Sequence, residues 1–193
     1  RGLGTLLMET ALNALVAAGT RTVWLTASAA GRPIYERLGF VALDRVRRWR
    51  GRGEVCPDVR PGTASLGDLV RRDAAGWGDP RASIVRRVAQ QGRVVADANG
   101  FLVLQQSSAG TQLGPWSSAD ATAAAELLNT ALVEADQGPE LFLDVPAANV
   151  AAAQILQQRG FAVCGETLLM YLGGRPDYRP ELVYALASMG SMG

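Results

Sequence analysis

The sequence predicts an α/β fold, in which helices alternate with the strands of a mixed sheet. Two observations support this prediction. The order helix, strand, helix, Gly-Phe, strand is expected once in residues 5–49 and again in residues 119–172. In both stretches, apolar residues at helical spacing alternate with short apolar runs, which are typical of buried strands. We therefore expect two related units in tandem.

The first unit opens on a glycine turn that leads directly into a helix. Apolar residues at helical spacing predict this helix over about residues 5–18. Residues 23–26 are short and apolar, as in a buried strand, and Pro33 suits the first turn of a second helix that ends at Gly39. Partial alternation of apolar and charged residues predicts a strand over residues 40–49.

Residues 53–62 are rich in glycine, proline and charge and show no periodicity, so we expect a linker there. It divides the chain into residues 1–52 and 63–193. In the second part, the expected elements are a helix from residue 66, a helix over 81–91, a hairpin of 93–97 and 100–105, a turn at 113–116, a helix over 119–134 capped by Ser118, a strand over 141–145, a helix over 149–159, a strand over 161–172 bulged at Gly165, and a strand over 182–186.

The composition excludes several classes of function. The net charge of +1 provides no field that would recruit nucleic acid, and no run approaches the roughly 18 apolar residues of a membrane span. Because there is no secretory signal, we expect a cytoplasmic protein. Histidine is absent, which removes the commonest metal ligand, so we expect no metal. Cys56 and Cys164 match no metal or redox spacing and are expected as free thiols, or else as a chance pair.

The glycine turn has two interpretations. Gly2 and Gly4 remove side chains at a place where the backbone can approach a ligand closely. The helix that follows begins with unpaired N–H groups and a partial positive charge, which together favour a phosphate group. Alternatively, the two glycines only make a tight turn. No Gly-Lys-Ser/Thr follows, so the turn is not a P-loop.

Two motifs together resemble the GNAT superfamily of N-acetyltransferases. Residues 2–5 (Gly-Leu-Gly-Thr) are similar to the end of its acyl-CoA pyrophosphate loop, Gln/Arg-x-x-Gly-x-Gly/Ala. Residues 35–40 (Tyr-Glu-Arg-Leu-Gly-Phe) are similar to its Tyr-Glu-x-x-Gly-Phe signature. In this register the leading Gln/Arg would precede Arg1. We therefore expect an N-terminally truncated fragment, whose first unit is the C-terminal half of a catalytic domain.

The resemblance implies transfer of an acetyl group from acetyl-CoA to an amine of a small molecule or peptide. It implies that Tyr35 protonates the CoA thiolate, since a phenol with an ordinary pKa near 10 stays protonated at neutral pH. Tyr35 as a merely packed aromatic residue is the other possibility. Arg32 either contacts the 3′-phosphate or is solvated. The residues that the resemblance places around the cofactor are Arg1, Gly2, Leu3, Gly4, Thr5, Leu6, Ser28 and Arg32.

The second unit resembles the same fold without its catalytic parts. Leu156 stands at the position of Tyr35, and Asn149 keeps an asparagine that the family often has where the first unit has Ser28. Residues 113–118 stand where the pyrophosphate loop would be, but they include a proline and a tryptophan. This arrangement is similar to bacterial two-domain acetyltransferases with a degenerate, complete GNAT-like second domain.

Four further residues are candidates for an acceptor pocket: Trp77, Asp79, Trp116 and Asp144. Each also has a structural interpretation, in which the tryptophans belong to the core and the aspartates begin a helix or cap a turn. Three other functions stay open. They are a CoA-binding regulatory module without turnover, a protein in which the second unit binds while the first is a scaffold, and an unrelated phosphate-binding α/β domain. We expect neither a nucleic acid nor a membrane as partner, and the sequence predicts no oligomeric state.

Overall fold

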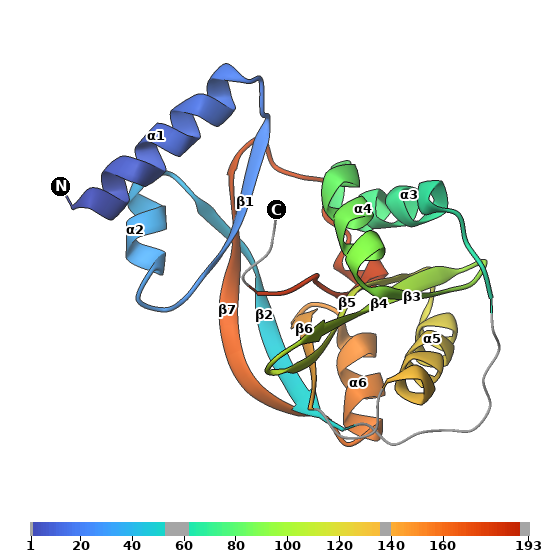
Figure 1. Cartoon of the computed structure of the whole chain (residues 1–193). Coiled ribbons are helices and arrows are strands. Elements are labelled where there is room, and N and C mark those ends of the chain that lie inside the picture. Colours follow the sequence, from blue (N-terminus) through green and yellow to red (C-terminus); the bar gives the residue numbers. More distant parts are fainter. Residues whose placement is uncertain (1, 53–61, 136–139, 190–193) are drawn as a thin grey trace.

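The computed structural model describes residues 2–52, 62–135 and 140–189 as a curved sheet with helices on both faces (Figure 1). The described strands are β1 (Thr22–Ala27), β2 (Val41–Gly51), β3 (Arg93–Ala96), β4 (Gly100–Ser107), β5 (Gly110–Ser118), β6 (Leu141–Pro146), β7 (Ala162–Gly173) and β8 (Val183–Ala185). The described helices are α1 (Leu3–Ala17), α2 (Arg32–Arg37), α3 (Leu66–Trp77), α4 (Ala82–Gln91), α5 (Ala121–Glu134), α6 (Val150–Gln158) and the short 3₁₀ helix η1 (Pro180–Leu182). The mixed sheet confirms the predicted α/β class.

The strands of the two predicted units interleave. Their order across the sheet is β1-β7-β2-β6-β5-β4-β3, and β8 pairs with β5 beside this path. The strand that follows each Gly-Phe dipeptide therefore lies inside the other unit: β7 runs between β1 and β2, and β2 runs between β7 and β6. The paired strands are antiparallel except β5 and β6, which are parallel. Because β1 and β2 are bonded through β7, the first unit depends on the second for its sheet.

Both units fold the same way at the Gly-Phe dipeptide. The backbone N–H of Phe40 donates to the carbonyl of Tyr35 at 3.0 Å, and that of Phe161 donates to the carbonyl of Leu156 at 3.0 Å. The glycine before each phenylalanine has a positive φ, 90° in the first unit and 75° in the second, which glycine adopts without strain. Tyr35 and Leu156 are thus structural equivalents.

Helices cover the sheet in two layers. Around β3–β6, α3 and α4 lie on one face and α5 and α6 on the other (Figure 1). In the first unit, α1 and α2 lie against β1 and the end of β7 (Figure 1), where Leu12, Ala27, Phe40 and Met170 form a small buried cluster. No helix within these described ranges is long and apolar enough to cross a membrane.

The turn predicted at residues 113–116 was wrong, because these residues lie within β5. Gly114 is required there by close packing: a Cβ atom would lie 1.9 Å from the carbonyl oxygen of Leu186. Pro115, which follows a cis peptide bond, has no N–H to give to a ladder, and the register of β5 with its neighbours shifts beside it. Such irregular positions are where a strand accepts proline.

Two other predictions, the cap of α5 and the bulge near Gly165, can be compared directly with the structure. Asp120, and not Ser118, caps α5, because its side chain accepts a hydrogen bond from the N–H of Ala123 at 2.9 Å. The bulge near Gly165 is confirmed: the register of β7 with β2 skips Cys164, which is a free, exposed thiol. Cys56 lies outside the described residues, as does the predicted linker apart from residue 62. The domain boundary stays a prediction.

Candidate functional site

Among the described residues, no side chain caps the backbone donors at the N-terminus of α1. Gly2 is the N-cap and has an extended backbone (φ −76°, ψ 158°), with no side-chain hydrogen bond to the helix. The N–H groups of Thr5 and Leu6 donate to its carbonyl at 3.1 and 3.3 Å. The N–H groups of Leu3 and Gly4 stand at the first two helical positions. The helix contains no carbonyl to which they could donate a hydrogen bond. They add to the partial positive charge at this end of the helix.

Neither glycine at this N-terminus is needed for packing within the described chain. A Cβ atom built on Gly2 or Gly4 would meet no other atom within 4 Å, and neither residue has a positive φ. A glycine within a helix costs about 1 kcal/mol relative to alanine. The missing side chains therefore leave open space beside the free N–H groups.

Tyr35 is held beside this space by the start of α2. Its ring packs edge-on against Phe40, with 5.9 Å between the ring centroids, and the side chain is half-buried. On the other side, a Cβ atom on Gly31 would lie 3.2 Å from the ring, so glycine there leaves room for the tyrosine. The ring therefore has an ordered position.

A cavity of about 560 Å³ joins the two features. It is lined by Gly2, Gly4, Thr5, Leu7, Met8, Ile34 and Tyr35. The structure thus places residues about thirty positions apart in the sequence around one space. Of the other predicted loop residues, Leu3 and Leu6 have exposed side chains, and Arg1 lies outside the described residues.

Leu7, Met8 and Ile34 line the cavity but were not among the predicted site residues. A signal for them exists in the sequence. Leu7 and Met8 follow Gly4 by three and four residues, and residues at that spacing share one face of a helix. Ile34 directly precedes Tyr35 in α2. Together they give the cavity an apolar wall.

Ser28 and Arg32 serve the turn before α2. The carbonyl of Ser28 accepts hydrogen bonds from the N–H groups of Gly31 and Arg32 at 3.0 and 2.9 Å, and its Oγ accepts one from Gly31 at 3.2 Å. Arg32 Nε lies 2.6 Å from Glu36 Oε1 in a half-exposed ion pair. Neither residue lines the cavity beside Tyr35. Arg32 instead lines a smaller cavity of about 300 Å³ at the end of β1, together with Glu166.

Three of the four predicted acceptor residues are buried inside the protein. Trp77 lies under the guanidinium of Arg81, whose Cζ is 3.8 Å from the centroid of the indole ring. Trp116 packs against Tyr184, with 5.0 Å between their ring centroids. Asp144 is fully buried in a two-bonded ion pair with Arg48, at 2.8 Å for each bond.

The ion pair of Asp144 raises the pKa of Arg48 above its ordinary value, because the carboxylate stabilises the charged guanidinium. Asp144 also accepts a hydrogen bond from the N–H of Met189 at 2.7 Å. Asp79, the fourth candidate, lines a different cavity at the far end of α1. None of the four lies in the cavity beside Tyr35, so their role in an acceptor pocket stays a prediction.

Comparison with known proteins gives matches over both parts of the chain. Two family models, each described as an acetyltransferase (GNAT) domain, match residues 69–185 and residues 1–52. The chain is 24% identical over 167 residues to the holothin acyltransferase of Pseudoalteromonas sp. (strain SANK 73390), covering 80% of this chain and 57% of that protein. It is 24% identical over 187 residues to the uncharacterized N-acetyltransferase YitH of Bacillus subtilis (strain 168), covering 85% and 62%. The chain thus spans less than two thirds of either relative.

Solved structures show the same fold. A putative acetyltransferase from Pyrococcus horikoshii superposes with a TM-score of 0.84 at 19% identity, covering 98% of this chain and 66% of that one. A GCN5-related N-acetyltransferase from Kribbella flavida superposes with a TM-score of 0.58 at 18% identity, covering 89% and 47%. At these identities the likeness concerns the fold alone.

Proposed function

Since the chain belongs to the GNAT acetyltransferase family, we propose that its first unit provides the acyl-CoA site of an N-acetyltransferase that acts on an amine. The observation that carries the proposal is the N-terminus of α1. Gly2 and Gly4 leave N–H groups uncovered and meet no atom of the described chain, and Tyr35 lines the same cavity. The names of the two relatives, an acyltransferase and an N-acetyltransferase, support the same reaction class.

The residues present suit the pyrophosphate of CoA. Uncovered N–H groups at a helix N-terminus bind phosphate oxygens, and the helix dipole adds a favourable field, so no lysine is required. The apolar wall of Leu7, Met8 and Ile34 suits the less polar parts of the cofactor. We assign the phosphate contacts to the N–H groups of Leu3 and Gly4.

In the proposed reaction, the amine nitrogen attacks the thioester carbonyl carbon. A C–N bond forms, the C–S bond breaks, and the electron pair of that bond goes to sulfur. Tyr35 donates its hydroxyl proton to the thiolate and regains a proton from solvent, while the amine gives its surplus proton to water. The remaining rate enhancement comes from holding the two reactants together.

Calorimetric titration of the chain with acetyl-CoA, and separately with CoA, tests the binding step. We expect one site per chain and dissociation constants between about 1 μM and 1 mM. The absence of heat from either ligand would overturn the proposed site. Binding of acetyl-CoA without release of CoA in the presence of any primary amine would leave a CoA-binding module without turnover.

The Tyr35→Phe variant tests the proton donor. We expect kcat to fall by about 100-fold, the lower end of general acid catalysis, while the KM for acetyl-CoA stays unchanged. Release of the CoA thiol, followed with a thiol reagent and a panel of primary amines, provides the measurement. Tyr171→Phe is the matched control, because Tyr171 lies in β7 and does not line the cavity. An unchanged kcat in Tyr35→Phe would leave Tyr35 as a packing residue.

A further inference from the structure

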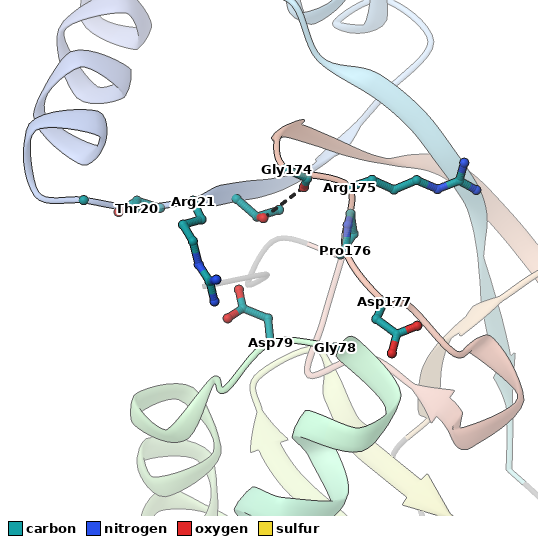
Figure 2. A pocket seen from close by; sticks show the side chains of 10 residues that line it. Thr20, Arg21, Gly78, Asp79, Gly174, Arg175, Pro176 and Asp177 are labelled. Carbon is teal, nitrogen blue, oxygen red and sulfur yellow. Dashed lines mark hydrogen bonds between the residues drawn. The ribbon is translucent and has the colours of Figure 1, made fainter.

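A second cavity, of about 500 Å³, lies at the opposite end of α1 (Figure 2). It is lined by Gly19, Thr20, Arg21, Thr22, Gly78, Asp79, Gly174, Arg175, Pro176 and Asp177. Met8 lines the cavity beside Tyr35, and from there α1 rises about 14 Å, at 1.5 Å per residue, before it ends at Ala17 near the second cavity. It is therefore a separate place in the molecule, formed jointly by the two units.

The walls of this cavity are backbone segments held close together. The N–H of Gly174 donates to the carbonyl of Arg21 at 2.9 Å, and the hydroxyl of Thr22 donates to the carbonyl of Gly174 at 3.0 Å. A Cβ atom on Gly78 would lie 2.4 Å from the carbonyl oxygen of Asp177, so only glycine permits that approach. The shape of the cavity is thus determined by the fold before any ligand arrives.

Two opposite charges face each other across the space. Arg21, just before β1, and Asp79, just after α3, point toward one another in Figure 2. In the described part of the chain, neither side chain forms an ion pair or a hydrogen bond. Nearby residues do form ion pairs, Arg81–Asp73 and Arg179–Glu181, with N···O distances of 2.7 and 3.0 Å. Arg175, by contrast, points away from the other two (Figure 2).

The surrounding backbone favours a positive group near Asp79. Both α1 and α3 end at this cavity, at Ala17 and Trp77, and a helix C-terminus carries a partial negative charge. A phosphate ion would meet these helix ends and the carboxylate of Asp79. A simple amine would meet the guanidinium of Arg21. A ligand that carries a carboxylate and an ammonium group on neighbouring atoms satisfies both sides.

We propose that this cavity binds a free α-amino acid through both of its charges. The guanidinium of Arg21 binds the carboxylate with its fork of N–H donors, and the carboxylate of Asp79 binds the ammonium. Pro176 lies between Arg175 and Asp177 on another wall of the cavity and provides an apolar surface for the side chain of the ligand (Figure 2). Because Arg21 and Asp79 come from different units, binding also links the two units.

The test is calorimetric titration of the chain with the twenty free amino acids, followed by two analogues of the tightest one. Its C-terminal amide lacks the carboxylate, and its N-acetyl derivative lacks the ammonium. We expect each analogue to bind about tenfold more weakly, the effect of losing one charge-assisted hydrogen bond. Equal binding of the amino acid and both analogues would overturn the proposal, as would the absence of binding by all twenty amino acids at millimolar concentration.

Variants test which side chain binds each charged group of the ligand. Arg21→Gln should bind the amino acid and its amide equally, and Asp79→Asn should bind the amino acid and its N-acetyl form equally. Arg175→Gln is the control and should keep the native preference. If Arg21 and Asp79 only join the two units, both variants will keep that preference, and the proposal is wrong. The titrations are repeated with saturating CoA. If CoA displaces the amino acid, the amino acid binds in the cavity beside Tyr35, and the proposal is wrong.

Discussion

The helices α1 and α5 occupy the same place in the repeated order of elements, but their N-termini are capped differently. Gly2 precedes α1 and offers no side chain, and Gly2, Gly4 and Thr5 line a cavity at this end of the helix. Asp120 precedes α5, and its carboxylate accepts the N–H of Ala123 at 2.9 Å. A helix N-terminus can bind an anion when its donors are free, and in α5 a carboxylate of the chain itself already occupies that position.

The same contrast recurs one helix later. Tyr35 is half-buried beside the cavity, whereas Leu156 is fully buried in the core between α6 and the sheet. Asn149, the equivalent of Ser28, caps α6 through the N–H of Ala152 and donates to two backbone carbonyls of the chain near β8, at 3.0 and 3.1 Å. The second unit uses both positions for stability, whereas in the first unit Tyr35 lines the cavity and Ser28 bonds within the turn before α2.

The largest effect should come from shortening the buried Leu156 side chain in the second unit. Leu156→Ala removes a fully buried side chain, so we expect the free energy of unfolding to fall by about 2–5 kcal/mol. Urea unfolding followed by circular dichroism measures this loss. Val150→Ala in the same helix is the control, because Val150 is exposed and should change stability by less than about 0.5 kcal/mol. Equal losses in the two variants would contradict a structural role specific to Leu156.

The second effect concerns the cap that α1 lacks. Gly2→Asp reproduces the arrangement of Asp120, and the space around Gly2 accepts a side chain. We expect the affinity for CoA to fall by about 100-fold, because a carboxylate competes for the N–H groups and repels the pyrophosphate. Thermal stability should stay equal or rise slightly, since aspartate caps a helix better than glycine.

Calorimetric titration with CoA measures the loss in Gly2→Asp. Gly2→Asn is the matched control, because it has the same shape and can cap the helix without the charge, and it should lose less affinity. If Gly2→Asp binds CoA as tightly as the native chain does, the N-terminus of α1 is not the phosphate site.

Sequence periodicity predicted the helices and most strands, because these depend on neighbouring residues. It did not predict β5 at residues 113–116, because Gly114 is required by its contact with Leu186, which lies far along the chain. For the same reason, it gave no indication that β2 and β7 would interleave. Long-range pairing decides both features.

The sites of the molecule likewise differ in how far the sequence predicts them. The glycine turn and Tyr35 were predicted, because two short motifs at a known separation point to them. The cavity between Arg21 and Asp79 was not, because it exists only where segments distant in sequence approach each other at Gly78 and Gly173. Features that arise from tertiary approach leave no local pattern in the sequence.

A smaller effect should follow from removing one backbone donor. Leu3→Pro deletes the N–H at the first helical position, where proline is well tolerated, and the extended backbone of Gly2 already suits a following proline. We expect about a tenfold loss of CoA affinity, the value of one hydrogen bond to a charged group, with an unchanged circular dichroism spectrum. Leu3→Ala is the control, because it keeps the N–H and loses only an exposed side chain. Equal affinities of the two variants would show that this N–H makes no phosphate contact.

The smallest effect tests whether the cap alone separates the two units. Asp120→Gly frees the N–H of Ala123, and because glycine is itself an acceptable cap, we expect a loss of only a few tenths of a kcal/mol in the free energy of unfolding. We also expect no second CoA site in calorimetric titration. A free N-terminus is one part of the proposed site, and in the second unit Leu156 fills the place where Tyr35 borders the cavity. A stoichiometry of two CoA per chain in Asp120→Gly would contradict this, and it would mean that the aspartate cap alone keeps the second unit from binding.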